Sequence, residues 1–310
     1  MTLALAYLID LLVGDPRWLP HPVVWMGKAI SKLDRLLAKR RGSKWEERAK
    51  GMLFPLLIAG GVFAVSFYLL QLLYSIHPWL GVGLEVWLIS TTIAVKGLAE
   101  AGRGVYQALR QGDLALARQR LSWIVGRDTE HLDEREIARG GIETVAENIV
   151  DAVTAPLFFA LLGGAPLALA YRAINTLDSM VGYKNEKYLH LGWASARLDD
   201  LANFIPARLT LPFLVLAAGK GGGRAWRIGL RDARKHPSPN SGYSEAVVAG
   251  ALQIRLGGEN SYQGVRSFRA HLGDPLVEIE AKHIVQTIWL LYRSTFLYLM
   301  FLLAVDWLIG

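Results

Sequence analysis

The sequence predicts an all-α polytopic membrane protein, with roughly four to five membrane-inserted helical segments plus cytoplasmic and interfacial helices. Three observations predict this class. Hydrophobic residues make up 52% of the 310 positions and charged residues only 20%, which is more apolar than an ordinary soluble domain. Several apolar runs are long enough to cross a bilayer, and Lys and Arg collect in the segments beside them. We expect a single membrane-integral domain over residues 1–310.

Composition also excludes several classes of protein. An aromatic content of 10% and Leu-rich runs exclude low-complexity disorder. The absence of cysteine excludes a disulfide scaffold and metal sites built on thiolate. A net charge of +7 would suggest nucleic acid in a soluble protein, but here the positive residues flank apolar runs and form no basic aromatic patch. We therefore expect a lipid bilayer, and no nucleic acid, as a partner.

The first two predicted helices lie at the membrane rather than across it. Thr2 to Val13 is about half as long as a crossing requires, and no positive residue precedes it as in a cleavable signal, so we expect it to be retained and partly inserted. Apolar residues between Val23 and Leu37 recur at helical spacing opposite Lys28, Lys32 and Arg35. This pattern predicts a helix along the membrane surface.

The strongest span is Met52 to Ile76, which contains no charged residue. A second apolar stretch from Trp79 to Val95 carries only Glu85, and Pro78 marks the joint of a helical hairpin. Lys and Arg are dense between residues 28 and 50, and the positive-inside rule places that segment in the cytoplasm. Residues 96–148 and 220–283 are then cytoplasmic as well.

Three later apolar runs differ in quality. Ile149 to Tyr171 contains the breaker cluster Gly163–Pro166, so it either spans or dips in and returns. Phe204 to Ala218 is short and contains two prolines and an arginine, which makes it a weak span. Ile284 to Ile309 carries Arg293 and Asp306 but is otherwise apolar, and is a good span.

The segment Gly140 to Asp151 (GGIETVAENIVD) is the most informative for chemistry. Glu143, Glu147 and Asp151 stand at i, i+4 and i+8 and would share one helix face at the start of an apolar run. Stacked acids repel, and their hard oxygens suit Mg²⁺ that bridges to phosphate. The alternative is pairing with nearby arginines, namely Arg135, Arg139 and Arg172.

Two further segments carry acids, amides and cations at helical offsets. One contains Asn175, Asp178 and Ser179, and the next contains Asp199, Asp200 and Asn203. The cations beside them are Lys184, Lys187, Arg197 and Arg208. Such density indicates either a functional site or an ion-paired structural network.

The segment Arg234 to Glu245 (RKHPSPNSGYSE) combines a Pro-stiffened loop with a helix start. Ser241 or Ser244 would cap an apolar helix from Ala246 to Leu256, and Lys235 and His236 stand beside its N-terminus. This is either a phosphate cradle or an ordinary capped helix. The Gly-rich turn from Gly257 to Gly264 would close that helix as a C-cap.

Two shorter turns carry further candidate residues, and several common catalytic motifs are missing from the sequence. GRDT offers Arg127 and Asp128, where Arg127 would pair with a phosphate or with Asp128 itself, and GDPRWLPHPV presents His21 in a loop whose role is open between function and structure. Walker A, H-E-x-x-H and G-x-S-x-G motifs are absent from the sequence. A nucleotide, if bound, is held in a less familiar way.

Taken together, these segments resemble the membrane-integral adenosylcobinamide-phosphate synthases, or cobinamide synthases, of cobalamin biosynthesis. The likeness covers nearly the whole chain in order and rests on GDPRWLPHPV, GRDT, ETVAENIVDAVTAPLFFALLGGAPLALAYRAINTLDSMVGYKNEKY, ARLDDLANFIPARL and HPSPNSGYSEAVVAGALQIRLGG. The resemblance implies an ATP-consuming amide ligase at the cytoplasmic face of the inner membrane. Its substrates would be adenosylcobyric acid, which reacts at a propionate, and aminopropanol or its O-phosphate.

For such chemistry we assign residues by type and placement. We assign the binding of Mg²⁺, and through it of the triphosphate of the co-substrate ATP, to Glu143, Glu147 and Asp151. The catalytic group is Asp178, Asp199, Asp200 and Lys184, with Asp178 or Asp199 as acceptor of the ammonium proton. The residues expected to bind phosphate groups and cofactor are Arg127, Asp128, Asn175, Arg197, Lys235, His236, Ser241 and Ser244.

Three questions remain open at this stage. Gathering all motifs on one side requires the Ile149–Tyr171 run to re-enter near Gly163, and we favour that topology. Charged residues beside broken apolar helices also describe a transporter of an anionic solute, which is the rival function. Paired glycines at Gly60 and Gly61 would permit close helix approach in a homo-oligomer.

Overall fold

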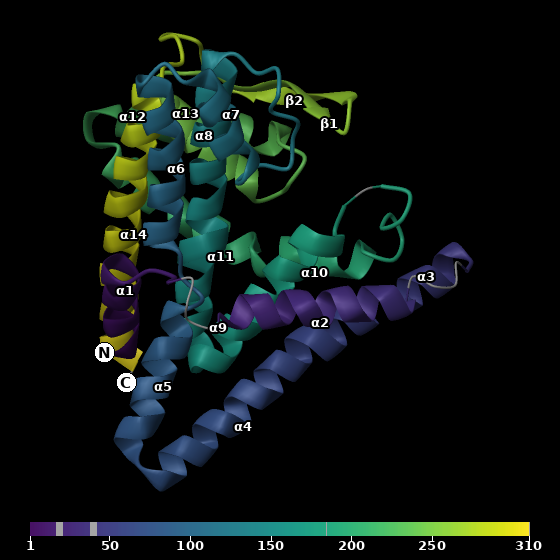
Figure 1. The fold of residues 1–310 in the computed structure, drawn as a ribbon. Helices are drawn as coiled ribbons and strands as arrows, with labels where there is room; N and C mark the ends of the chain where they lie inside the picture. Colours follow the sequence, from purple (N-terminus) through teal and green to yellow (C-terminus); the bar gives the residue numbers. More distant parts are fainter. Residues whose placement is uncertain (17–20, 38–41, 184, 310) are drawn as a thin grey trace. The chain divides into compact units, whose positions relative to one another are not determined.

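The computed structural model describes residues 1–16, 21–37, 42–183 and 185–309, and its helices and strands are shown in Figure 1. Lys184, to which the sequence analysis gives a catalytic role, lies outside the described residues. The predicted all-α class is confirmed, because helices form nearly every element. The α-helices are α1 (Thr2–Leu12), α2 (Pro22–Leu37), α3 (Lys44–Gly51), α4 (Gly60–Ile76), α5 (Pro78–Ser90), α6 (Val95–Arg110), α7 (Leu114–Ser122), α8 (Glu134–Ile149), α9 (Ala155–Val181), α10 (Trp193–Ala202), α11 (Phe204–Ala217), α12 (Gly222–Asp232), α13 (Ser241–Leu252) and α14 (Lys282–Ile309).

Short irregular turns and one small sheet complete the fold. Single π-helical turns, η1 (Pro55–Ala59) and η2 (Val150–Thr154), precede α4 and α9, and the 3-10 turns η3 (Gly219–Gly221) and η4 (Ala233–Lys235) flank α12. Strands β1 (Leu256–Tyr262) and β2 (Val265–Leu272) form an antiparallel hairpin. The all-α expectation did not include this hairpin.

Among the described residues, four helical stretches are long and apolar enough to cross a membrane, which confirms a multi-pass membrane protein. They are Lys44–Ile76, Pro78–Arg110, Glu134–Val181 and Lys282–Ile309. The segment predicted as a weak span qualifies only when α10 and α11 are counted as one broken span, which gives up to five. The helix Thr2–Leu12 is too short, as expected. The surface helix predicted after it is α2, and it buries Met26 and Ile30 of its apolar stripe.

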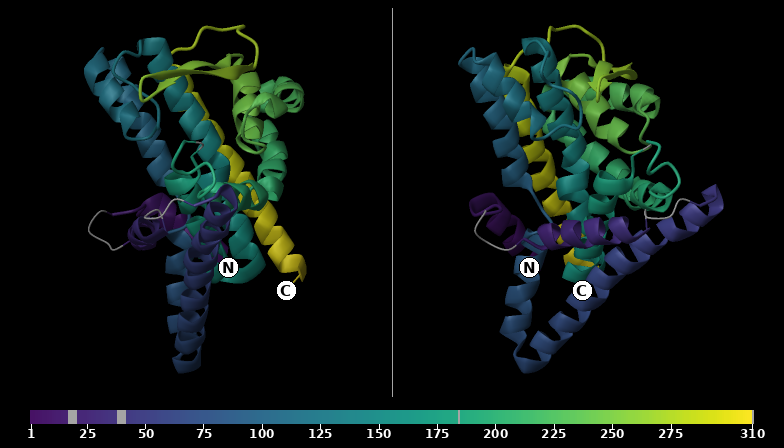
Figure 2. Two further views of the ribbon diagram at one scale, coloured as in Figure 1. Left: turned by 90° about the vertical axis from the view of Figure 1, so that its right-hand side faces the viewer. Right: turned by 45° about the vertical axis from the view of Figure 1, so that its right-hand side comes forward.

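By contact pattern the chain divides into two compact units. The first contains residues 1–94, 155–203 and 302–310. Within it, α4 and α5 form the predicted helical hairpin, visible in Figure 2. His77 joins them, since its Nδ1 accepts the Trp79 amide at 3.3 Å at the start of α5, where Pro78 is the first residue.

Helix α9 reverses direction in its middle. Gly163 and Gly164 have non-helical backbone angles, and Gly164 has a φ of +63°. The rings of Phe159 and Tyr171 stack with centroids 5.0 Å apart, whereas 12 residues of straight helix would separate them by about 18 Å. The two halves of α9 therefore fold back on each other. This fold-back is the geometry that the favoured re-entry of residues 149–171 requires, and re-entry into the membrane stays a prediction.

The tight turn needs glycine for two reasons. The positive φ of Gly164 disfavours L side chains. In addition, a Cβ at this position would stand 2.5 Å from Oε1 of Glu85 on α5. The carboxylate of Glu85 is itself fixed, because the Tyr74 hydroxyl donates to its Oε2 at 2.5 Å. The turn therefore requires a residue without a side chain at position 164, where the backbone approaches Glu85 closely.

The second unit contains residues 95–154 and 204–301. Helices α6 and α8 pack together through buried residues that include Val105, Ile142 and Val145. Helix α13 packs against α8, α11 and α12, and it contacts both strands of the hairpin. All residues of the site described next belong to this unit, unless stated otherwise.

The hairpin occupies the segment that the sequence analysis interprets as a helix C-cap. Helix α13 ends earlier, at Leu252, and Gln253 in the left-handed region (φ 64°) terminates it. The chain then pairs Leu256 with Leu272 and Tyr262 with Val265. Gln263 and Gly264 between the strands both have positive φ, which is the backbone of a type I′ hairpin turn. The C-cap interpretation of residues 257–264 is therefore wrong.

Candidate functional site

The centre of the site is a buried carboxylate between two arginines. Glu143 lies on α8 and is only 5% exposed. Arg127 donates to its Oε2 at 2.9 Å, and Arg139 donates to its Oε1 at 3.2 Å. Two guanidinium groups thus neutralise this acid inside the protein, where an unpaired charge would be most costly.

Local structure explains why Arg127 reaches α8. Asp133 caps the helix by accepting the Glu136 amide at 2.8 Å, which fixes where α8 begins. One turn and a half later, a Cβ on Gly140 would lie 2.6 Å from the Arg127 guanidinium. The glycine at this position therefore leaves the space in which Arg127 lies against the helix.

Arg139 ties the same cluster to the hairpin. Its guanidinium donates to the carbonyl oxygens of Gly257 and Glu259, both at 2.8 Å, and to Oδ1 of Asn260 at 3.0 Å. The Gly257 amide in turn donates to Glu143 at 2.9 Å. Arg127 also donates to the Asn260 oxygen. The arginines therefore bind α8 and β1 together through atoms more than 100 residues apart in sequence.

The predicted Mg²⁺ ligands are not gathered into one group. Both oxygens of Glu143 face cations and a backbone amide. Asp151 lies in the π turn η2, so the helical spacing that would align it with Glu143 does not continue through it. In the described part of the chain, no cluster of three or more His, Asp or Glu could hold a metal ion. The Mg²⁺ assignment stays a prediction, and Glu143 fits it poorly.

Glu147 is placed differently from Glu143. It is half-buried, and the Ser241 hydroxyl donates to its Oε1 at 3.1 Å. Ser241 is not the helix cap that the sequence predicts, because α13 begins at this residue. Ser238 serves the helix start instead, since its Oγ accepts the amides of Asn240 and Ser241 at 3.2 and 3.3 Å. Ser244 lies in the first turn and donates to the Ser241 carbonyl.

A buried histidine and acid face each other beside this helix start. His236 Nε2 lies 3.4 Å from Oε1 of Glu245, and both side chains are under 7% exposed. The Ser238 amide donates to Nδ1 of His236 at 3.0 Å, so the neutral ring carries its proton on Nε2. Neither Nε2 nor Oε1 has another hydrogen-bond partner among the described residues.

Burial decides the charge of this pair. Burial raises the pKa of the Glu245 carboxyl well above its usual range, and repulsion from Glu147 and Glu143 adds to the rise. Burial also lowers the pKa of His236. The structure therefore holds a neutral imidazole against a carboxyl group that readily keeps its proton, next to the acid Glu147.

Three residues predicted to bind phosphate or cofactor have structural partners instead. The Asp128 carboxylate accepts the amides of Gln263 and Gly264 at 2.9 and 2.8 Å and the Ser261 hydroxyl at 2.5 Å, which pins the hairpin turn. Lys235 contacts Asp232 at 2.6 Å. Arg127, likewise, pairs with Glu143 rather than with Asp128.

The remaining predicted residues belong to the first unit and form a cluster of their own. Asp199 is 9% exposed, and it accepts hydrogen bonds from Asn175 at 3.5 Å and from Asn203 at 3.1 Å. Asp178 is close enough to interact electrostatically with it. Asp200 pairs loosely with Arg197 at 3.6 Å. The structure thus groups Asn175 and Asp178 of α9 with Asp199 of α10, two segments that the sequence prediction treated separately.

A cavity of about 530 Å³ adjoins the arginine cluster. Arg139 and Asn260 line it together with Arg135, Arg255 and Arg266. Two histidines and two glutamates also line it: His131, His271, Glu136 and Glu259. Within the described residues, Arg255 and Arg266 form no ion pair. Four arginines against two acids make this cavity suited to an anion.

Sequence reasoning missed several of these residues. The hairpin that contains Asn260 was not predicted, because two such short strands show little alternation of polar and apolar residues. The Gln263–Gly264 pair at the turn was a local indication of it. Glu245 stood at the end of a quoted motif but was given no role, since its burial depends on packing. Arg139 was considered only as a partner that would make the acids structural.

Comparison with known proteins identifies the family of the chain. A family model described as CobD/Cbib protein matches residues 3–291. The cobalamin biosynthesis protein CobD of Halalkalibacterium halodurans is 50% identical over 301 residues, covering 96% of this chain and 93% of that protein. The cobalamin biosynthesis protein CbiB of Salmonella arizonae is 47% identical over 310 residues, covering 99% and 97%. No solved structure matches the chain. On the extent of this similarity, the chain belongs to the CobD/Cbib protein family.

Proposed function

We propose that this protein is an ATP-dependent acid–amine ligase of cobalamin biosynthesis. It would attach aminopropanol or its O-phosphate to a propionate of adenosylcobyric acid and so form adenosylcobinamide or its phosphate. The observation that carries the proposal is the similarity along nearly the whole chain to proteins named for cobalamin biosynthesis. The buried acid–base groups and the cationic cavity support it because amide synthesis from ATP needs both.

The first chemical step needs an anion site. A carboxylate does not react with an amine at neutral pH, so the γ-phosphoryl group of ATP is transferred to the propionate to give an acyl phosphate and ADP. The cavity beside Arg139 is suited to the triphosphate, because Arg135, Arg255 and Arg266 line it and arginine binds phosphate with paired donors. A soluble enzyme would commonly use a Gly-rich loop here, and this sequence has no Walker A motif.

The second step needs a proton acceptor. The incoming amine is an ammonium ion at neutral pH and must lose a proton before its nitrogen attacks the acyl phosphate and orthophosphate leaves. Glu147, with the neutral His236 and Glu245 beside it, supplies an acceptor in the same unit as the cavity. Asp178 and Asp199 of the first unit remain the acceptors proposed from sequence alone.

Mg²⁺ would enter with the nucleotide rather than occupy a protein cage. In phosphoryl-transfer sites this ion is commonly bound by one or two carboxylates together with substrate phosphates. When bound, it would neutralise charge on the transferred phosphoryl group. Asp151 is the residue proposed to meet it, whereas Glu143 holds the arginines and Glu147 is the proposed proton acceptor.

We also propose the inner membrane as the location and the cytoplasm as the side of the active site. The basic segment before α4 supports this orientation through the positive-inside rule. The reversal within α9 supports it further, since Asn175 and the residues after it in α9 would then return to the side from which α9 enters.

The deciding experiment is mass spectrometry of the corrinoid product. Purified protein in lipid nanodiscs receives adenosylcobyric acid, ATP, Mg²⁺ and competing aminopropanol, aminopropanol phosphate and ethanolamine phosphate. We expect one amide product and ADP release only when corrinoid and amine are both present. Glu147→Gln should lower turnover about a hundredfold or more, whereas Glu130→Gln, at an exposed position, should leave turnover unchanged.

The rival function has its own outcome. An anionic solute that accumulates in sealed proteoliposomes, without formation of an amide, would support a transporter and refute the ligase.

A further inference from the structure

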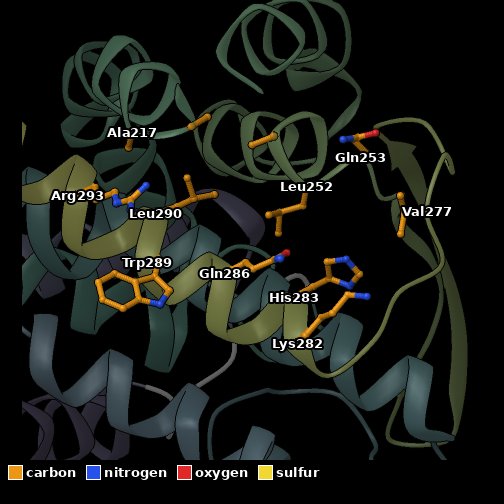
Figure 3. Close-up of a pocket in the computed structure, with 12 residues that line it drawn as sticks. Ala217, Leu252, Gln253, Val277, Lys282, His283, Gln286, Trp289, Leu290 and Arg293 are labelled. Carbon is orange, nitrogen blue, oxygen red and sulfur yellow. The ribbon is translucent and has the colours of Figure 1, made fainter. Parts of the chain in front are cut away.

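A second cavity of about 540 Å³ lies where α11 ends and α14 begins. Figure 3 shows Leu252, Gln286 and Leu290 near its middle, Lys282 and His283 at one end and Arg293 at the other. The two helices pack antiparallel there: Phe213 of α11 contacts Tyr298 and Phe301 of α14, and one turn beyond Phe213 the cavity opens. Nothing in the proposed reaction uses this place.

The charged side chains that line the cavity are Lys282 and Arg293, and no acid lines it. Lys282 also pairs with Glu280, outside the lining, at 2.7 Å, and His283 adds a ring whose Nδ1 accepts the Glu280 amide. A neighbouring cavity of about 410 Å³ shares Gln253 and is lined by Lys220, Arg224 and Arg227, again without an acid. Within the described residues, these three side chains and Arg293 form no ion pair. Cations gathered in this way repel one another unless an anion lies among them.

Gln253 is positioned at the junction of the two cavities by an unusual backbone. It is one of two non-glycine residues with positive φ in the described chain. Its carbonyl accepts the amides of Leu276 and Val277 at 3.1 and 3.0 Å, which holds it there. Its left-handed backbone is that of the residue that ends α13, and it leaves Gln253 on the lining of both cavities.

The walls of the cavity indicate which kind of anion fits. Ala217, Leu252 and Leu290 are apolar, and Trp289 is 57% exposed beside them. Arg293 lies over the Trp289 ring at 5.9 Å. The exposed surface of α14 continues as Phe296 and Met300. The occupant must therefore carry a negative group and hydrocarbon side by side.

The length of α14 places this junction at the membrane surface. The helix has 28 residues and is about 42 Å long, whereas the hydrocarbon layer is about 30 Å thick. Its last 20 or so residues suffice to cross, so Trp289 and Arg293 stand near the lipid–water boundary, where Trp and Arg are favoured. The segment between α11 and α14 is the basic one predicted to be cytoplasmic.

We propose that this cavity binds the phosphate headgroup of an anionic phospholipid. Arg293 and Lys282 would contact the phosphate, Gln253 and Gln286 would donate hydrogen bonds, and the acyl chains would lie along Trp289 and the apolar surface of α14. Basic cavities between helices at the cytoplasmic side are suited to such headgroups. This site is separate from the cavity proposed for ATP and does not depend on the proposed reaction.

The test is native mass spectrometry of the full-length protein with phosphatidylglycerol and phosphatidylcholine titrated separately. We expect saturable binding of phosphatidylglycerol and at least about tenfold weaker binding of phosphatidylcholine. The double variant Lys282→Gln/Arg293→Gln should weaken phosphatidylglycerol binding about tenfold or more. Lys282→Arg/Arg293→Lys keeps both charges and should bind nearly as wild type, and Arg110→Gln, an exposed cation of α6, should have no effect.

Several results would overturn the proposal. Equal binding of both lipids to the wild-type protein would refute it, and this measurement does not depend on whether a variant folds. So would unchanged phosphatidylglycerol binding in the folded double glutamine variant. Displacement of the lipid by inorganic tripolyphosphate at the same site would assign the cavity to a soluble phosphate ligand instead.

Discussion

Replacing Glu143 tests whether the buried arginine cluster is a charge-balanced structure. Glu143→Ala leaves Arg127 and Arg139 without their shared acid, and the side chains of both arginines are at most 6% exposed. Loss of one partner of a buried ion pair costs about 3–5 kcal/mol in the free energy of unfolding. This loss approaches the whole net stability of many proteins.

A neighbouring acid gives the matched control. Glu136 contacts the same Arg139 at 2.5 Å, but its side chain is 34% exposed. Water and salt screen such a pair, so Glu136→Gln should cost only about 0–1 kcal/mol. The contrast between the two variants arises from burial, because the arginine is common to both.

The assay is thermal unfolding of the protein in nanodiscs, monitored by tryptophan fluorescence. We expect Glu143→Ala to lower the apparent melting temperature by on the order of 10 °C and Glu136→Gln by about 2 °C or less. Equal effects of the two variants would refute the reasoning. A Mg²⁺-dependent rise in wild-type melting temperature that Glu143→Gln abolishes would instead make Glu143 a metal ligand.

Three further predictions concern the α9 reversal, the buried Glu245 and the side of the membrane. Gly164→Ala should cost about 2 kcal/mol or more, because alanine disfavours the left-handed backbone and its Cβ would clash with the half-buried carboxylate of Glu85. Gly60→Ala, with open space around it, should be tolerated in the same thermal assay. Since the folded pKa of Glu245 is raised above its ordinary value of 4.5, the free energy of unfolding should fall as pH rises from 4.5 toward that folded value. Glu245→Gln should remove this fall in a pH series of melting temperatures, and an unchanged slope would contradict it. The chain contains no cysteine, so a single introduced cysteine reports the side of the membrane. In whole cells treated with a membrane-impermeant thiol reagent, Ser179→Cys should stay unlabelled, whereas Ser75→Cys, near the α4–α5 turn, should react; both positions are exposed. Labelling of both variants would place residue 179 on the outer side.

Local composition was sufficient to predict the helical stretches. A run such as Met52 to Ile76 forms a helix in a bilayer because each backbone group must find its partner within the segment. The short turn at Pro78 and the amphipathic α2 follow from single residues and spacing in the same way. Local offsets also placed Asn175 and Asp178 near each other on one helix, whereas the contact with Asp199 joins α9 to α10 and required the tertiary structure.

The local sequence pattern could not predict which group each charged residue would contact. An alignment of Glu143, Glu147 and Asp151 assumed regular helix, but the π turn at residues 150–154 interrupts that spacing. Whether an acid binds a metal or an arginine depends on what packs against it from elsewhere in the chain. For Glu143 that neighbour is a hairpin that begins at Leu256.

The sequence by itself determined the helical class, the membrane spans and the family, because each depends on composition and order along the chain. Only the tertiary structure decided that α9 turns back, that two arginines enclose Glu143 and that His236 faces Glu245. These features arise from contacts between distant segments, and the energy of a buried charge is set by those contacts rather than by its neighbours in sequence.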